Sequence, residues 1–129
     1  MSMKAIAHCQ QPWEAWREGV KTRMLVSARL GAAQLCIFEQ QVAPGTGAPT
    51  HCHPVEEVLT VVDGEAEVWV ESARLTLAAG QSLVVPAKRY HGFRNSGMRT
   101  LHIHAILASP IFEALADGTS EPVRRWEAP

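Results

Sequence analysis

Residues 45–64 read GTGAPTHCHPVEEVLTVVDG, and this stretch decides the fold and the site. His51 and His53 stand two apart, and Glu57 follows four residues after the second histidine. Residues two apart on a strand project to the same side, so both imidazoles can face one cavity. The run 57–62 is rich in β-branched residues and ends at Asp63-Gly64, a strong hairpin signal. The stretch therefore predicts two strands that flank a shared interior.

Further strand-length runs lie on both sides of this stretch. Residues 65–70 alternate with period 2, as expected for a half-buried strand. Several short strands separated by Gly and Pro turns favour a β-sandwich or barrel over a parallel α/β sheet. The remaining predicted strands are 34–42, 75–77, 82–85 and 100–107. We predict one all-β domain spanning residues 1–129, with a barrel core at about 20–108.

The two ends of the chain show a different pattern. Residues 12–16 place two tryptophans three apart, which allows a turn of helix. Residues 109–117 begin with Ser-Pro and are followed by Gly118, which predicts a short helix after the last strand. Residues 121–129 are expected to form an arm on the surface or on a partner. Helix is thus predicted only in short terminal segments.

A third histidine completes a set of candidate metal ligands. His91 follows the predicted strand 82–85 after a short loop. Three neutral imidazoles and one carboxylate make a ligand set for a divalent first-row metal. We therefore predict one divalent transition metal per chain, held by His51, His53, Glu57 and His91. Nitrogen and oxygen donors suit iron, manganese, nickel, zinc or copper, and the sequence does not choose among them.

At these residues the sequence resembles a family, the small single-domain cupins of the cupin type 2 kind. Their first motif is a glycine, five residues, His-x-His, three or four residues, a glutamate, six residues and a glycine, and every spacing fits residues 45–64. Their second motif places a glycine, a proline, a second glycine, a histidine and an asparagine in order. Gly80, Pro86, His91 and Asn95 match it, but Lys88 replaces the second glycine. The resemblance implies a jelly-roll β-barrel and metal binding by the four residues.

Lys88 raises a question about the loop before His91. If the backbone there has a positive φ angle, a lysine would carry strain of about 1 kcal/mol. We expect instead that the turn is slightly shifted and that His91 still points inward.

Two further residues are candidate catalytic groups. His102 and His104 share one face of the strand 100–107, and if that face lines the cavity, His104 could act as an acid or base. The alternative is an interface or solvent-facing histidine. Tyr90 precedes a ligand and could donate a proton or orient a substrate, although a loop tyrosine usually only packs.

Composition excludes several classes of partner. Apolar residues make up 47% and charged residues 19%, as in a globular domain. The net charge of -1 argues against nucleic acid and acidic membrane partners. No apolar run approaches the roughly 18 residues of a membrane span, and three cysteines are an odd, irregular set. We therefore expect a cytoplasmic protein. Four tryptophans in so small a domain, with Trp69 on a charged strand face, predict a homodimer.

These features point to a metal-dependent enzyme that acts on a small organic molecule. Four protein ligands on a six-coordinate ion leave two positions for substrate, water or oxygen. Cupins of this kind include dioxygenases, isomerases, cyclases and lyases, so the fold does not select the reaction. The alternative hypothesis is a non-catalytic module that binds or senses a small molecule.

Overall fold

The computed structural model describes residues 3–129, which form strands almost throughout. Two short 3-10 turns, η1 (His8–Gln10) and η2 (Ala28–Leu30), interrupt them. The strands are β1 (Trp13–Arg17), β2 (Val20–Val26), β3 (Cys36–Val42), β4 (Gly47–Cys52), β5 (Glu57–Asp63), β6 (Glu65–Val70), β7 (Ala73–Ala78), β8 (Ser82–Val85), β9 (His91–Asn95), β10 (Leu101–Leu107), β11 (Phe112–Ala116) and β12 (Val123–Arg125).

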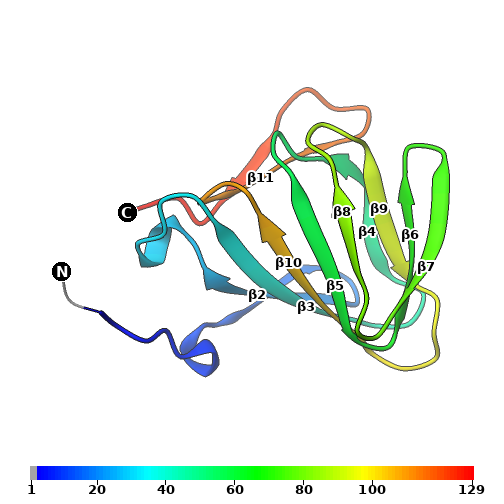
Figure 1. Ribbon diagram of the computed structural model, residues 1–129, viewed down its shortest axis with the longest axis horizontal. Helices are drawn as coiled ribbons and strands as arrows, with labels where there is room; N and C mark the ends of the chain where they lie inside the picture. Colours follow the sequence, from blue (N-terminus) through cyan, green and yellow to red (C-terminus); the bar gives the residue numbers. More distant parts are fainter. Residues whose placement is uncertain (1–2) are drawn as a thin grey trace.

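The strands form two antiparallel sheets of six that face each other (Figure 1). The first sheet has the order β1-β2-β3-β10-β5-β8, and the second has the order β12-β11-β4-β9-β6-β7. Neighbouring strands in each sheet are mostly distant in sequence, as Greek-key connections require. The prediction of an all-β jelly roll is confirmed.

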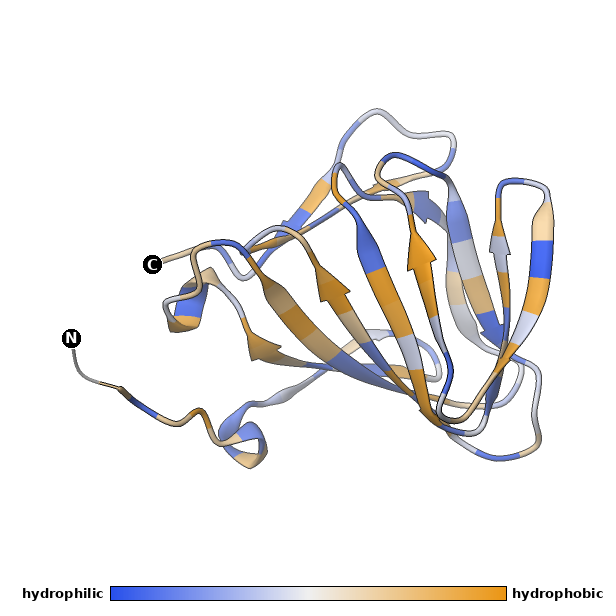
Figure 2. Ribbon diagram, viewed as in Figure 1, coloured by the Kyte–Doolittle hydropathy of each residue, from blue (hydrophilic) through white to orange (hydrophobic). Residues whose placement is uncertain are grey.

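The core lies between the two sheets. Inward positions alternate along each strand, so Val61 on β5, Ile103 on β10 and Val68 on β6 are at most 1% exposed. Figure 2 shows hydrophobic residues concentrated along the strands and polar residues dominating the connections. The period-2 alternation of the sequence therefore reports which side of each strand faces the core.

Asp63 and Gly64 do not form the predicted hairpin. β5 pairs with β10 and β8 in the first sheet, whereas β6 pairs with β7 and β9 in the second. Gly64 has φ 91° and lies where the chain passes from one sheet to the other. A turn glycine indicates a change of direction, but it does not say whether the next strand pairs with the last one.

The predicted C-terminal helix over 109–117 is wrong, because the chain forms β11 there. Phe112 and Ala114 are buried while their neighbours are not, which is a strand pattern. β11 pairs with β4 on one side and with β12 on the other. The local preference of Ala, Leu and Glu for helix is overridden by these backbone partners.

The tail is also not the predicted arm on the surface or on a partner, because part of it joins the second sheet and the core. β12 pairs with β11, and Trp126 is 2% exposed and packs on Phe38 and Phe112. The indole nitrogen of Trp126 donates to Glu14 Oε2 at 2.9 Å. Trp126 therefore belongs to the core, and it no longer supports the prediction of a contact surface.

The expected turn of helix at residues 12–16 is replaced by strand β1. Of the 3-10 turns, η1 lies near the N-terminus, but η2 falls inside the range expected to be free of helix. Among residues 3–129, no helical segment has the length and apolar character that a bilayer crossing requires.

Candidate metal centre and cavity

The two sheets bring the four predicted ligands to one place between them. His51 on β4 and His91 on β9 are direct cross-strand partners, and His53 follows the end of β4. Glu57 is the first residue of β5 in the opposite sheet. Two imidazoles therefore come from strands of one sheet, the third from the segment directly after β4, and the carboxylate from the other sheet.

The side chains lie within coordinating distance of one another. One ring nitrogen of each of the three histidines lies within 4.8 Å of the others. Glu57 Oε1 lies 3.0 Å from His91 Nε2, and Oε2 lies 3.4 Å from His53 Nε2. His53, Glu57 and His91 are almost fully buried, whereas His51 is half-buried. The structure thus clusters all four residues, and His51, Glu57 and His91 line one cavity.

Backbone carbonyls fix the orientation of each imidazole. His51 Nδ1 lies 2.6 Å from the oxygen of Pro49, His53 Nδ1 2.8 Å from that of Glu113, and His91 Nδ1 2.9 Å from that of Arg89. A carbonyl only accepts, so each Nδ1 carries the proton and each Nε2 is left with a lone pair. Metal-ligating histidines are oriented in the same way.

The inward nitrogens fit a cation. His53 Nε2 is buried and has no hydrogen-bond partner among the described residues. His91 Nε2 faces a carboxylate oxygen, and two acceptors at 3.0 Å require a proton or a metal ion between them. The donor set therefore suits a divalent transition metal.

The charges of the cluster follow from burial and from the neighbours. Burial acts to raise the pKa of Glu57, but the neighbouring imidazoles of His53 and His91 outweigh burial and lower the value to about 2. Burial, and then the neighbouring His91 and His53, lower the pKa of His51 to about 4. At neutral pH the site therefore offers an ionised carboxylate and at least one neutral imidazole, as metal binding requires.

The loop that carries Lys88 has the strained conformation. Lys88 has φ 66°, so the expected shift of the turn does not occur. Its backbone N–H donates to the carbonyl of His53 at 2.8 Å. The left-handed backbone conformation of Lys88 thus accompanies a hydrogen bond between the loop before His91 and the backbone of His53.

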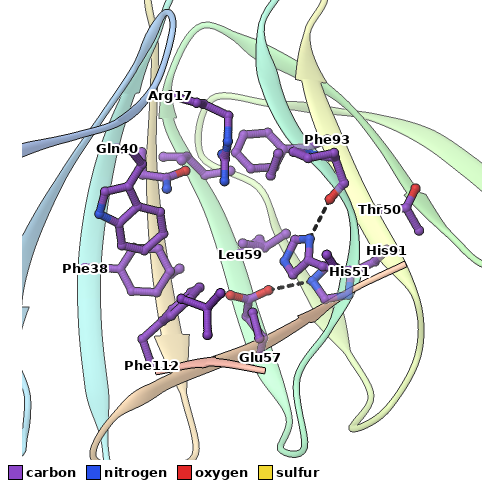
Figure 3. A pocket seen from close by; sticks show the side chains of 18 of the residues that line it. Arg17, Phe38, Gln40, Thr50, His51, Glu57, Leu59, His91, Phe93 and Phe112 are labelled. Atoms are coloured by element: carbon purple, nitrogen blue, oxygen red, sulfur yellow. Dashed lines mark hydrogen bonds and ion pairs between the residues drawn. The ribbon is translucent and has the colours of Figure 1, made fainter. Parts of the chain in front are cut away.

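A cavity of about 150 Å³ opens beside the cluster (Figure 3). Figure 3 shows His51, His91 and Glu57 at one end, Phe38 and Phe112 along one side, and Arg17 reaching in from another. Most of the remaining lining is aliphatic, and Gln40 is its main uncharged polar side chain. The arrangement gives a small apolar chamber with a coordinating end and a cationic end.

A family model described as the cupin domain matches residues 38–107 of the chain. The chain belongs to the cupin family.

Curated relatives of this cupin match only part of their own length. The HTH-type transcriptional regulator SutR of Escherichia coli is 30% identical over 60% of the chain, which spans 46% of that protein. The polyketide synthase CurC of Streptomyces cyaneus is 36% identical over a region that covers 59% of this chain and 47% of the length of CurC. The chain therefore spans about half the length of the curated relatives it matches.

Solved structures share the fold of this cupin over most of its length. The polyketide cyclase RemF of Streptomyces resistomycificus has a TM-score of 0.75 at 20% identity, covering 93% of this chain and 89% of its own. An RmlC-like cupin of Shewanella frigidimarina has a TM-score of 0.72 at 26% identity. The match covers 84% of this chain and 92% of that protein.

The two predicted catalytic residues lie outside the cavity of this cupin. His104 is on the outer face of β10, where its ring lies beside His102, so it does not face the cavity. His102 Nε2 lies 2.7 Å from Glu39 Oε1, and Arg23 holds the other oxygen of that carboxylate at 3.0 Å. The inward face of β10 carries Leu101, Ile103 and Ala105, which are apolar and buried.

Tyr90 lies in a shallow hollow on the outer side of the second sheet, beside Trp69 and Asp117. It does not line the cavity.

Sequence reasoning missed the residues at the other end of the cavity. Gln40 is 4% exposed on the inward face of β3, between Phe38 and Val42. A polar residue at an apolar position of a strand is a signal that could have found it. Arg17 at the end of β1 carries no comparable local signal.

Proposed function

We propose that this cupin is a metal-dependent enzyme that acts on a small organic molecule bound in the cavity. The observation that carries the proposal is the set of inward nitrogens and one ionised carboxylate at the wall of a largely apolar chamber. His51, His53, Glu57 and His91 would hold one divalent metal. The ion would supply Lewis acidity or activate oxygen, because four protein ligands leave sites open on a six-coordinate ion.

The residues of the chain would prepare the site for this chemistry. The carbonyls of Pro49, Glu113 and Arg89 hold the rings in the tautomer that binds metal. The phenyl walls exclude water around the reacting molecule, which strengthens electrostatic interactions there. Dioxygenase, isomerase, cyclase and lyase reactions all fit such a site, and relatives of this fold include a polyketide cyclase and an oxalate decarboxylase.

The alternative is a binding or sensing module without catalysis. The similarity to part of a transcriptional regulator favours it. A catalytic site and a sensor differ in turnover. Conversion of a bound molecule that stops when the metal is removed would support the enzyme, and saturable binding without conversion would support the sensor.

Metal content tests the proposed ligands. We expect about one divalent ion per chain in the purified protein and its loss in His53→Ala. His8→Ala is the matched control, because this imidazole is exposed and belongs to neither group of clustered His and Glu side chains, so the metal should stay in place. Equal metal content in the two variants would remove His53 from the site.

Exchangeable positions on the metal test the capacity for catalysis. Cobalt-loaded protein should change its visible spectrum when azide is added, because catalytic sites keep a position for an external ligand. A four-coordinate spectrum that does not respond to azide would indicate a closed, structural metal.

We also infer a homodimer, now from the outer face of the first sheet. Cross-strand pairing aligns one apolar residue from each of five strands in a row, with Ile106 39% and Val84 55% exposed. The row is Val26, Ile37, Ile106, Val58 and Val84. Contiguous exposed apolar surface of this kind marks a contact site.

Light scattering tests the inferred homodimer. The wild-type protein should be a dimer, Val84→Glu should dissociate it, and Leu75→Glu, at an exposed position in the other sheet, should not. A monomeric wild-type protein at micromolar concentration would contradict the inference.

A further inference from the structure

The end of the cavity opposite the imidazoles carries more positive than negative charge. Arg17 reaches into the cavity from the end of β1 (Figure 3). Its guanidinium Nη1 donates to the carbonyl of Gly47 at 3.2 Å, and it forms no ion pair with any carboxylate of residues 3–129. Other arginines, such as Arg23 with Glu39 at 3.0 Å, do have such a partner.

A second arginine adds to this charge. Arg125 on β12 also lines the cavity, with its guanidinium 4.3 Å from the centre of the Trp16 ring. Its Nε is buried and makes no hydrogen bond within the described part of the chain. Burial, and then the charge of Arg125, lower the pKa of Arg17. Because an arginine keeps its proton at physiological pH, both groups present cationic donors.

Only one of these two arginines has a carboxylate partner. Arg125 Nη1 lies 4.0 Å from Glu14 Oε1, whereas Arg17 has no such partner among residues 3–129. Glu57 is the only carboxylate among the described residues that line the cavity, and it lies against His91 and His53 at the opposite end. A bound divalent cation would make the cavity still more positive. Arg17 is exposed and has no carboxylate partner within residues 3–129, so its guanidinium is free to pair with an anionic occupant of the cavity.

The walls between the two charged ends limit the rest of the occupant. Phe38, Phe93 and Phe112 line the chamber, together with Trp16. These rings offer faces and edges against which a further aromatic ring can pack. A volume of about 150 Å³ is similar to that of an apolar protein cavity that binds benzene, so the space fits a molecule with about one ring.

We propose that the cavity binds a small aromatic carboxylate, with its ring among the phenyl side chains and its carboxylate on Arg17. The guanidinium suits a planar carboxylate because it can donate two parallel hydrogen bonds. Arg125 adds charge at the same end. This inference names the substrate class of the proposed function and rests on it only for the claim that the bound molecule is then transformed.

Benzoate is the probe, and benzamide is its neutral counterpart of the same shape. Calorimetry with the protein as purified should show benzoate binding about tenfold or more tightly than benzamide, the ratio expected of a hydrogen bond to a charged group. Arg17→Gln should remove most of that difference. Arg94→Gln is the matched control, because Arg94 is exposed and does not line the cavity. It should bind benzoate as the wild type does.

Two additional measurements separate this inference from the proposed metal chemistry. The titrations are repeated after treatment with a chelator, since a carboxylate that bound only the metal would then lose its preference. Metal content is measured in Arg17→Gln, which should retain the ion. Preference for benzoate that persists without metal and depends on Arg17 supports the inference even if the protein turns nothing over. Equal binding of benzoate and benzamide overturns it, as does equal benzoate affinity in the two arginine variants or no benzoate binding up to about 10 mM.

Discussion

Replacing Lys88 with glycine should stabilise this cupin. Lys88 has φ 66°, and a non-glycine residue in the left-handed region loses about 1–2 kcal/mol. Glycine restores that energy but gains freedom in the unfolded chain, which costs about 0.5–1 kcal/mol. The side chain is exposed, and the backbone bond from residue 88 to the carbonyl of His53 does not depend on it. The net expectation is a gain of about 0.5–1 kcal/mol.

The corresponding change in melting temperature follows from the size of the chain. Unfolding 129 residues releases about 270 cal/mol/K of entropy near the midpoint. Lys88→Gly should therefore raise Tm by about 2–4 °C. Ala87→Gly is the control, because Ala87 does not have a positive φ angle. It should lower Tm by a similar amount.

Calorimetric melting of both variants at one metal concentration is the assay. Opposite signs at two adjacent positions would be hard to produce by any effect other than backbone conformation. A fall in Tm for Lys88→Gly as large as that for Ala87→Gly would refute the left-handed conformation at residue 88.

Three other predictions follow from burial and charge. Trp126→Ala should lower the free energy of unfolding in urea by about 3–5 kcal/mol, because the indole is 2% exposed and hydrogen-bonded. A decrease of less than about 1 kcal/mol would contradict the burial of Trp126. Native protein should show one fast-reacting thiol per chain with a disulfide reagent, since Cys9 is exposed whereas burial, aided by Glu57, raises the pKa of Cys36 to about 12. Burial lowers the pKa of His53, but the Glu57 carboxylate 3.4 Å from its Nε2 outweighs this and raises the value, so protons compete with the metal for this ring. Metal affinity in a competition titration should therefore fall as the pH drops from neutral, and a constant affinity down to pH 5 would contradict the ligand role.

The grouping of the candidate ligands was predictable because it depends on short spacings. His51 and His53 lie two residues apart next to a strand end, and Glu57 opens the following strand, so local geometry sets most of their arrangement. Strands 65–70 and 82–85 match their predicted limits, since turn residues bound each run. Where sequence neighbours determine the structure, period-2 alternation is sufficient.

The features that were not predicted depend on distant partners. Phe112–Ala116 becomes a strand only because β4, some sixty residues earlier, offers it an edge. Alternation shows that His102 and His104 share a face, but that face is the outer one because Leu101 and Ile103 fill the interior. Arg17 reaches the cavity through the pairing of β1 with β2 and the closure of the sandwich. Such contacts are set by tertiary packing, which local patterns do not encode.

The division of the four candidate ligands between the two sheets has a mechanical consequence. Glu57 belongs to one sheet, whereas His51 and His91 belong to the other and His53 directly follows it, so an ion held by all four would hold the two sheets together. Amide protons in both sheets should then exchange more slowly together when metal is added, rather than in one sheet alone. The coordination geometry would also report the distance between the two sheets. A substitution that changes this distance, such as one at Leu59 next to the cavity, would alter the coordination geometry without changing any ligand.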